Sequence, residues 1–220
     1  MSNSVSLPSV QPATPIGLRW TVVFVLALWF ALVVALGGTG AFVRPPGTPP
    51  VPIALGFAVP LVVFFVGLGL SRAFREFVSA LDVPVMLAVQ AWRFAGLGFL
   101  ALYTYDLLPA GFALPAGLGD MAIAATAPWV LFAVIRRSQF IGSRTFVVWN
   151  ALGILDLVYA VGVGALTSTL ATGAAGEVAM TPMAQLPLVL IPAFFVPILI
   201  MLHVSALIQA RRVAAALGAS

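Results

Sequence analysis

Six long apolar runs alternate with short polar or turn-rich segments along the chain. Each run is close to the roughly twenty residues that an α-helix needs to cross a bilayer. We therefore predict an all-α, polytopic membrane protein with one six-helix transmembrane domain over residues 16–212. The predicted spans are residues 19–37, 51–70, 84–108, 112–135, 146–167 and 186–208.

Three segments outside the spans have their own patterns. Residues 1–15 are rich in Ser and Pro and begin without a basic region, which predicts a disordered tail and not a cleavable signal peptide. Residues 213–220 are expected to form a short C-terminal tail. Residues 71–82 place apolar side chains at helical spacing, which predicts a helix lying in the membrane interface. These side chains are Phe74, Phe77, Val78 and Leu81.

Composition agrees with lipid as the main solvent of the surface. Hydrophobic residues make up 62% of the chain and charged residues 7%, whereas soluble domains have about one-quarter charged residues. No cysteine is present, which excludes disulfides, thiolate metal sites and cysteine nucleophiles. The net charge of +4 would suggest a nucleic-acid partner in a soluble protein. Here the basic residues lie at the ends of apolar runs, so the expected partner is the lipid bilayer and no nucleic acid.

The arginines predict the orientation of the chain. With the N-terminus inside, one arginine, Arg44, falls in an outer loop and another, Arg93, falls within a span. The remaining eight fall on the inner side, and an excess of basic residues marks the cytoplasmic side. They are Arg19, Arg72, Arg75, Arg136, Arg137, Arg144, Arg211 and Arg212. We expect both termini in the cytoplasm. Arginine as the sole basic residue suggests a GC-rich bacterial genome, and hence a bacterial inner membrane.

Three ionisable residues are predicted to meet near the middle of the membrane. Arg93 stands nine residues after Pro84, about 13 Å along a helix. Asp120 follows about eight residues of the antiparallel fourth run, and Asp156 lies about ten residues, roughly 15 Å, into the fifth. Arg93–Asp120 is the best predicted contact. Gln90 and Tyr159, in the same spans, complete this set of ligand-binding or proton-coupling candidates.

Such a cluster has two interpretations. One arginine and two ionised acids sum to −1, an excess that a proton, a bound cation or water in a cavity can offset. We expect Asp156 to carry the proton, because Arg93 has the shorter sequence route to Asp120. The alternative is a buried staple between the third and fourth helices, with Asp156 protonated and hydrogen-bonded.

Residues 107–120 combine two prolines and three glycines before Asp120. This composition predicts a broken or re-entrant start of the fourth helix. Such irregular backbone is tolerated only where protein or a water-filled cavity supplies its hydrogen bonds. Tyr103 and Tyr105 at the outer end of the third helix are typical of an aromatic belt, with a substrate gate as the alternative. Asp106 beside them is a secondary candidate.

The sixth run contains three prolines, which predict a kinked helix. Its His203 is the chain's single histidine and is expected level with Asn150 on the fifth helix. A helix contact through hydrogen bonds is favoured over a haem ligand or a proton relay, because one histidine without cysteine does not define a metal site. We predict no metal site and no cofactor. The chain has no nucleophile elbow, zinc-protease motif or phosphate loop, so an enzyme is the less favoured interpretation.

Three stretches resemble a pattern found in an uncharacterised family of small bacterial multi-pass membrane proteins. They are QAWRFAGLGFLAL (90–102), LPAGFALPAGLGD (108–120) and LPLVLIPAFFVPILIMLHVSAL (186–207). The resemblance covers the third to sixth helices, a little over half of the chain. It implies that Arg93, Asp120 and His203 belong among the candidates, and it supplies no substrate, cofactor or mechanism.

Three hypotheses about function follow. The first is binding or translocation of a small solute or ion in a polar pocket enclosed by the last four helices and open to the outer side. The second is a structural or accessory subunit, as a homo-oligomer or with a partner membrane subunit, that packs through small-residue faces. The third is a membrane redox or lipid-modifying enzyme with a haem or quinone near His203.

Overall fold

The structure, a computed structural model, describes residues 16–218. These residues form helices and connections without a strand, and six of the helical segments are long and apolar enough to cross a membrane. The six segments are Ile16–Gly38, Val51–Leu70, Val83–Thr104, Ala110–Arg136, Arg144–Leu170 and Ile191–Gly218. This architecture indicates a multi-pass membrane protein. The predicted tail at residues 1–15 lies outside the described residues.

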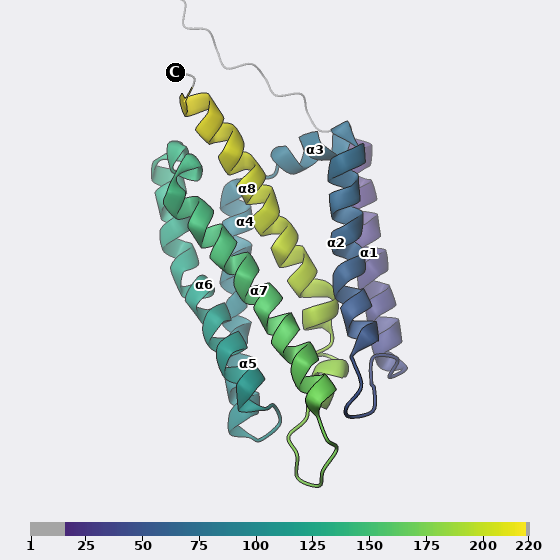
Figure 1. Cartoon of the computed structure of the whole chain (residues 1–220). Helices are drawn as coiled ribbons and strands as arrows, with labels where there is room; N and C mark the ends of the chain where they lie inside the picture. Colours follow the sequence, from purple (N-terminus) through teal and green to yellow (C-terminus); the bar gives the residue numbers. More distant parts are fainter. Residues whose placement is uncertain (1–15, 219–220) are drawn as a thin grey trace, which may run out of the picture.

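The helices run alternately up and down (Figure 1). The start of α1 and the end of α8 lie at one end of the bundle, together with α3 and the connection between α6 and α7. Loops 39–50 and 171–190 lie at the opposite end. The elements are α1 (Ile16–Gly38), α2 (Val51–Leu70), α3 (Arg72–Ser79), α4 (Val83–Gln90), η1 (Ala91–Gly96), α5 (Leu97–Thr104), α6 (Ala110–Arg136), η2 (Ser138–Gly142), α7 (Arg144–Leu170), η3 (Thr181–Ala184), η4 (Ile191–Phe195) and α8 (Val196–Gly218).

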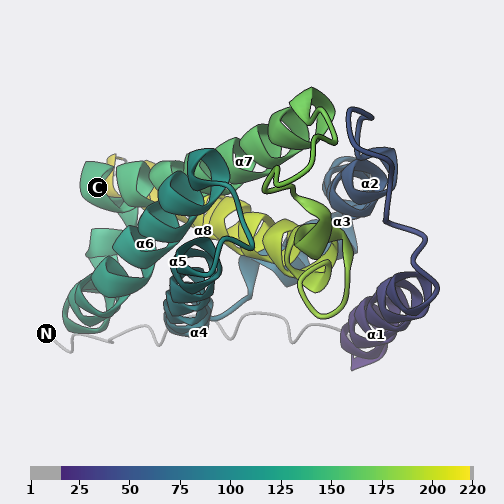
Figure 2. The same ribbon diagram turned by 90° about the horizontal axis from the view of Figure 1, so that it is seen from below.

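The third to sixth spans pack closely, whereas α1 lies at the edge (Figure 2). In α1 the buried residue is Val33, and the indole N–H of Trp29 donates to the carbonyl oxygen of Ala193 at 3.0 Å. In a regular helix the N–H four residues later would bind that carbonyl, but the residue there is Pro197, which has no N–H. The carbonyl of Ala193, which lacks its usual helix donor because of Pro197, is thus bound by Trp29 of α1.

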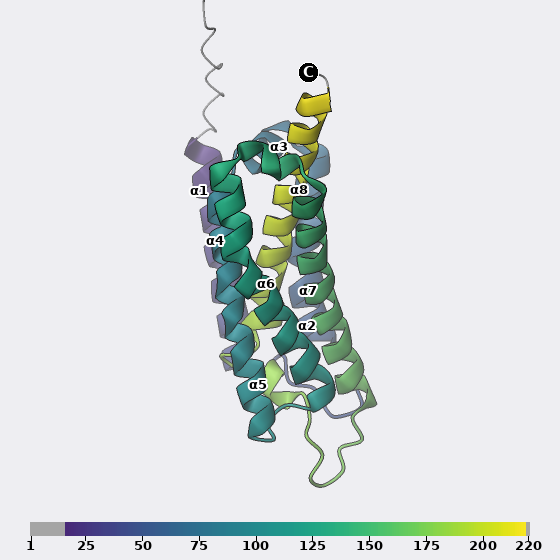
Figure 3. The ribbon, with the colours of Figure 1, turned by 90° about the vertical axis from the view of Figure 1, so that its left-hand side faces the viewer.

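The irregular backbone lies in the third and sixth spans, so the prediction of a broken fourth helix is wrong. The third span changes from α4 to the 3₁₀ segment η1 and back to α5, beside an unbroken α6 (Figure 3). The sixth span begins with a π-helical turn, η4. Pro115 is tolerated in α6 because the donor it removes would bind Gly111, which lies in the first turn of α6 and is exposed.

Two further boundaries differ from the sequence predictions. The helix α8 continues to Gly218, so residues 213–218 are helical and not a tail. Pro187 precedes the sixth helix, which begins at Ile191 and not near residue 186. Residues 71–82 contain the short helix α3, which begins where the Ser71 hydroxyl accepts a hydrogen bond from the N–H of Phe74.

Two apolar cores occupy the two ends of the packed spans. The core toward the termini includes Leu87, Ile123 and Phe146, and the core toward the opposite loops includes Phe99 and Phe112. In the third, fourth and fifth spans, residues 90–93, 120 and 150–156 fall between residues of these two cores. The ionisable residues therefore form a layer inside the bundle, flanked on both sides by apolar packing.

The connection between α7 and η3 is held by the carboxylate of Glu177. It accepts hydrogen bonds from the N–H groups of Thr172, Gly173 and Ala174 and from the Thr172 hydroxyl. These bonds, those from Thr172 foremost, hold the pKa of Glu177 below its usual range. Because the folded pKa is the lower one, the bonds stabilise this loop above the ordinary carboxyl pKa and are lost as the pH falls through the folded value.

Candidate functional site

Arg93 is the centre of the buried charged layer. Its side chain is 1% exposed, and it lies in η1. The guanidinium Nε donates to Oδ1 of Asp120 at 2.7 Å, and Nη2 donates to Oδ2 of Asp156. Arg93 thus joins the third, fourth and fifth spans. The predicted Arg93–Asp120 contact is confirmed, and both carboxylates converge on the same guanidinium.

The remaining nitrogen, Nη1, contacts two acceptors. It donates to the carbonyl oxygen of Gly153 at 3.3 Å and lies 3.5 Å from Nε2 of His203 on α8. A guanidinium presents donors in a fixed planar fork, which is why one side chain can contact groups from three neighbouring helices at once. The sequence reason for placing a proton on Asp156 is the shorter sequence route from Arg93 to Asp120, and it does not distinguish the two acids because Arg93 contacts both.

Glycines allow the helices to approach closely enough for these contacts. A Cβ on Gly96 would lie 2.6 Å from Cβ of Asp120, and a Cβ on Gly117 would lie 2.9 Å from the carbonyl oxygen of Gly96. Both distances are shorter than a normal contact, so η1 and α6 can pack this closely only because both positions are glycine. This approach brings the Nε of Arg93 within reach of Asp120.

Two more glycines make room for the other partners. A Cβ on Gly119 would lie 1.7 Å from Oδ1 of Asp156, and a Cβ on Gly153 would lie 2.3 Å from Nε2 of His203. The Asp156 carboxylate and the His203 ring therefore occupy space that any side chain at these positions would fill. These glycines bring the helices together and also accommodate the polar groups.

His203 is 1% exposed and extends the network toward the end that carries the termini. Its Nδ1 lies 2.9 Å from Oδ1 of Asn150, and the Asn150 Nδ2 donates to the carbonyl oxygen of Phe146 at 2.9 Å. The Trp149 ring packs edge-on against the imidazole with 5.5 Å between centroids, and its Nε1 donates to the Thr126 hydroxyl. His203 and Asn150 are predicted to lie at the same depth, and their direct contact confirms this prediction.

These partners select one tautomer of His203. The carbonyl of Phe146 can only accept, so Asn150 directs its NH₂ toward Phe146 and its Oδ1 toward the ring. Arg93 can only donate, so the Nε2 that faces it must accept. The ring is therefore neutral, with its proton on Nδ1, and both nitrogens face protein partners.

We expect the nitrogen chemical shifts of His203 to report a neutral, Nδ1-protonated imidazole at pH 7. Nitrogen-15 NMR of labelled full-length protein in detergent can measure this without ambiguity, because the chain has one histidine. The Asn150→Leu variant removes the acceptor for Nδ1, and we expect it to lower the free energy of unfolding by about 1–3 kcal/mol. A predominantly Nε2-protonated or doubly protonated ring in the wild type would contradict the assignment.

The other predicted candidates lie apart from this network or contribute no hydrogen bond to it. Gln90 is 1% exposed, and its Oε1 has no hydrogen-bond partner within residues 16–218. Tyr159 is 52% exposed on the outside of α7. Asp106 lies in the exposed turn after α5 with a φ of 55°, a left-handed conformation that aspartate tolerates better than most residues. Tyr103 and Tyr105 are exposed beside it.

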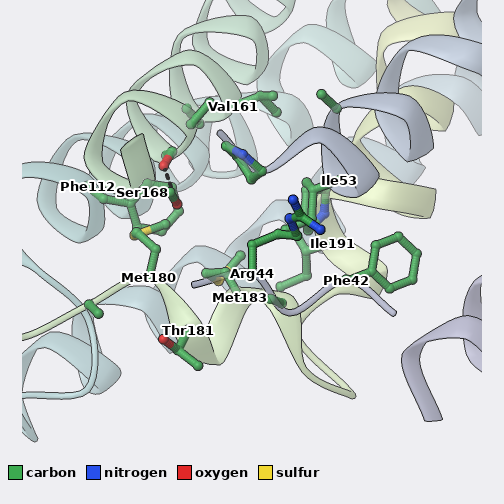
Figure 4. A pocket seen from close by; sticks show the side chains of 18 of the residues that line it. Phe42, Arg44, Ile53, Phe112, Val161, Ser168, Met180, Thr181, Met183 and Ile191 are labelled. Atoms are coloured by element: carbon green, nitrogen blue, oxygen red, sulfur yellow. Dashed lines mark hydrogen bonds between the residues drawn. The ribbon is translucent and has the colours of Figure 1, made fainter. Parts of the chain in front are cut away.

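A cavity extends from the loops opposite the termini to Asp120. Its volume is about 110 Å³. Loop residues around Arg44 and Thr181 and α7 residues Val161 and Ser168 line it (Figure 4). The α2 residue Ile53 also lines it, so its walls are not limited to the last four helices as the sequence suggested.

The chemistry of the cavity wall also differs from the expected polar pocket. Most lining residues are apolar, and two charged side chains, Arg44 and Asp120, are among them. Asp120 belongs to both the charged layer and the cavity wall, and its side chain is 16% exposed. Arg93, by contrast, is almost fully buried behind it. Next to the charged layer the cavity thus presents the carboxylate of Asp120 and not the guanidinium of Arg93.

Several residues of this site had no clear sign in the sequence. Gly96, Gly119, Thr126 and Trp149 each contact the network or make room for it. Glycine within an apolar run is a general sign of close helix approach. It does not identify the polar group that occupies the space.

The fold and the site together define an all-helical protein of the multi-pass membrane type, with a buried layer of ion-paired residues and an apolar cavity that reaches it. Residues 50–211 match the model of the family described as "Domain of unknown function (DUF8737)", and the chain belongs to this family. The match includes the whole charged layer. Searches of curated proteins and of solved structures each gave no significant match.

Proposed function

We propose that this chain is a bacterial inner-membrane protein with both termini in the cytoplasm. The proposal is supported by the eight arginines that the sequence assigns to one side of the membrane against Arg44 on the other. The elements that carry many of them, α3, the α6–α7 connection and the end of α8, lie at the same end of the bundle (Figure 1). In this orientation the cavity opens toward the periplasm.

The same protein binds a small solute or ion in the cavity, with Asp120 at its inner end. The observation that carries this proposal is that Asp120 both pairs with Arg93 and lines the cavity. A purely structural ion pair would not need an opening. Intramembrane charges cost on the order of 3 kcal/mol each, and residues of this kind mark substrate and ion pathways in membrane proteins.

Binding is coupled to the charge of the layer. His203 is neutral, so Arg93, Asp120 and Asp156 carry a net charge of −1 when both acids are ionised. A proton on the Asp120–Asp156 pair or a cation in the cavity offsets that excess. A solute that brings positive charge to Asp120 would therefore compete with the proton, which is the elementary requirement for proton-coupled exchange.

A thermal-stability screen of purified full-length protein against a library of small solutes tests the proposal. A true ligand at one hundred times its Kd stabilises the folded state by about 2.7 kcal/mol. We expect at least one solute to stabilise the wild type and the Asp106→Asn control but not Asp120→Asn. Asp156→Asn, which changes the charge of the layer without changing the cavity wall, should alter the pH dependence of binding.

The opposite outcome is equally clear. The solute-binding proposal fails if no solute stabilises the wild type and if proteoliposomes with Asp120→Asn or Asp156→Asn take up the screened solutes at the wild-type rate. A structural or accessory role then explains the fold better, and α1, with its largely exposed surface, is the first surface to examine for a partner helix.

A further inference from the structure

The wall of the cavity defines the chemistry of its ligand. We propose that the cavity binds a small molecule with an apolar body and a cationic hydrogen-bond donor, such as a primary amine, with the amine at Asp120. This inference rests on the proposed function and names its ligand class. It depends on three features of the site: the size and polarity of the cavity, the free oxygen of Asp120 and the sign of the buried charge.

The cavity accommodates an apolar body of limited size. A dry engineered cavity of about 150 Å³ binds benzene, so a cavity of about 110 Å³ accommodates at most a group of roughly six carbon atoms. On α7 the wall includes Leu157, Ala160, Val161 and Gly164, which follow one helix face. A Cβ on Gly164 would lie 3.4 Å from the Met180 and Phe112 side chains, an ordinary van der Waals contact, so these side chains pack closely against α7 at this point.

Asp120, which lines the cavity, has one carboxylate oxygen without a donor among the described residues. Arg93 binds Oδ1 of Asp120, and no donor within residues 16–218 binds Oδ2. An ionised carboxylate can only accept, so the matching ligand group must donate. An ammonium group presents three donors and a positive charge, which makes it the stronger partner for Oδ2 than a hydroxyl group.

The sign of the buried charge disfavours a carboxylate end group at Asp120. A carboxylate end group at Asp120 would need a guanidinium beside it. Arg44 lines the cavity from the exposed 39–50 loop, and Arg93 is 1% exposed with its nitrogens in contact with Asp120, Asp156, Gly153 and His203. Such a ligand would meet the Asp120 carboxylate with no donor between them. An amine instead offsets the net charge of −1 and leaves the four existing partners of Arg93 in place.

Direct titration of three matched probes tests the inference. Hexylamine, hexanol and hexanoate share one apolar body and differ only in the end group, and each is titrated into the full chain in detergent at pH 7. We expect saturable hexylamine binding that is at least tenfold tighter than hexanol binding, and no saturable hexanoate binding. From butylamine to hexylamine the affinity should rise about fourfold per methylene group, the ratio that corresponds to ~0.8 kcal/mol.

Two variants separate the amine contact from the apolar contact. Asp120→Asn should weaken hexylamine at least tenfold while hexanol changes by less than threefold, and Asp106→Asn, an exposed acid outside the cavity, should change neither. Val161→Trp fills the cavity and should weaken both probes. This second variant keeps the charged layer intact, so it tests the cavity even if Asp120→Asn does not fold.

Each contrary result overturns a distinct statement. If hexanoate binds as tightly as hexylamine, or if Asp120→Asn leaves hexylamine binding unchanged, the ligand class is wrong. If methylamine or potassium alone binds with dependence on Asp120 while the longer amines gain nothing, the proposed function stands and the apolar body is wrong. If no probe binds saturably to the wild type, the inference fails, and the solute screen decides the proposed function separately.

Discussion

Replacement of Arg93 with glutamine is expected to lower the free energy of unfolding by about 3–5 kcal/mol, the usual cost of removing one partner from a buried charge network. The variant would leave the Asp120 and Asp156 carboxylates without their shared guanidinium and His203 Nε2 without a donor. Unfolding of the purified protein in mixed detergent and SDS micelles measures the change.

The controls for this variant separate lost charge balance from lost packing. Arg93→Lys keeps the charge, but a lysine ammonium is a point charge and cannot reproduce the planar fork, so we expect it to restore less than half of the loss. A triple variant, Arg93→Gln with Asp120→Asn and Asp156→Asn, removes every charge from the layer and should be more stable than Arg93→Gln alone. If Arg93→Gln is as stable as the wild type, Arg93 does not hold the three spans together.

Replacement of Gly119 with alanine is expected to displace the Asp156 carboxylate from Arg93. The new Cβ would lie 1.7 Å from Oδ1 of Asp156, a distance that forces the carboxylate or α6 to move. We expect a loss of about 1–3 kcal/mol in the free energy of unfolding, typical of overpacking. The same micellar unfolding experiment measures it.

Gly162→Ala is the matched control for this effect. Gly162 lies on α7, and a Cβ there would meet no atom within 4 Å. Alanine has the higher helix propensity, so this variant should be equally stable or up to about 1 kcal/mol more stable. In the double variant Gly119→Ala with Asp156→Ala, the clashing carboxylate is absent. The two losses should therefore be less than additive, and strict additivity would contradict the proposed clash.

The change of helix type in the third span lies within the charged layer. A regular α-helix and a 3₁₀ segment direct successive side chains differently, because they have 3.6 and 3.0 residues per turn. In this chain η1 carries Arg93 and ends at Gly96, where α6 approaches most closely. The local change of helix type therefore coincides with the place where three helices share one side chain.

The site residues that could be identified from sequence are those that share one depth in the membrane. Arg93, Asp120 and Asp156 each lie about halfway along an apolar run, and a helix rises by a constant 1.5 Å per residue. Counting residues therefore predicts which groups share a level. The same count placed Asn150 level with His203. It could not predict that Arg93 would contact Asp156 as well as Asp120.

The sequence by itself determined the six spans, their even number and the depth of the buried charges, because hydrophobic length and helix rise are properties of a single segment. Tertiary structure alone decided which face of each helix meets which neighbour. Because of this packing, Gly96 and Gly119 are needed for the close approach of the helices. The irregular backbone lies in the third and sixth spans and not in the fourth, and α2 forms part of the cavity wall. These features depend on rotation about helix axes and on distances between helices, which packing among segments far apart in the chain sets.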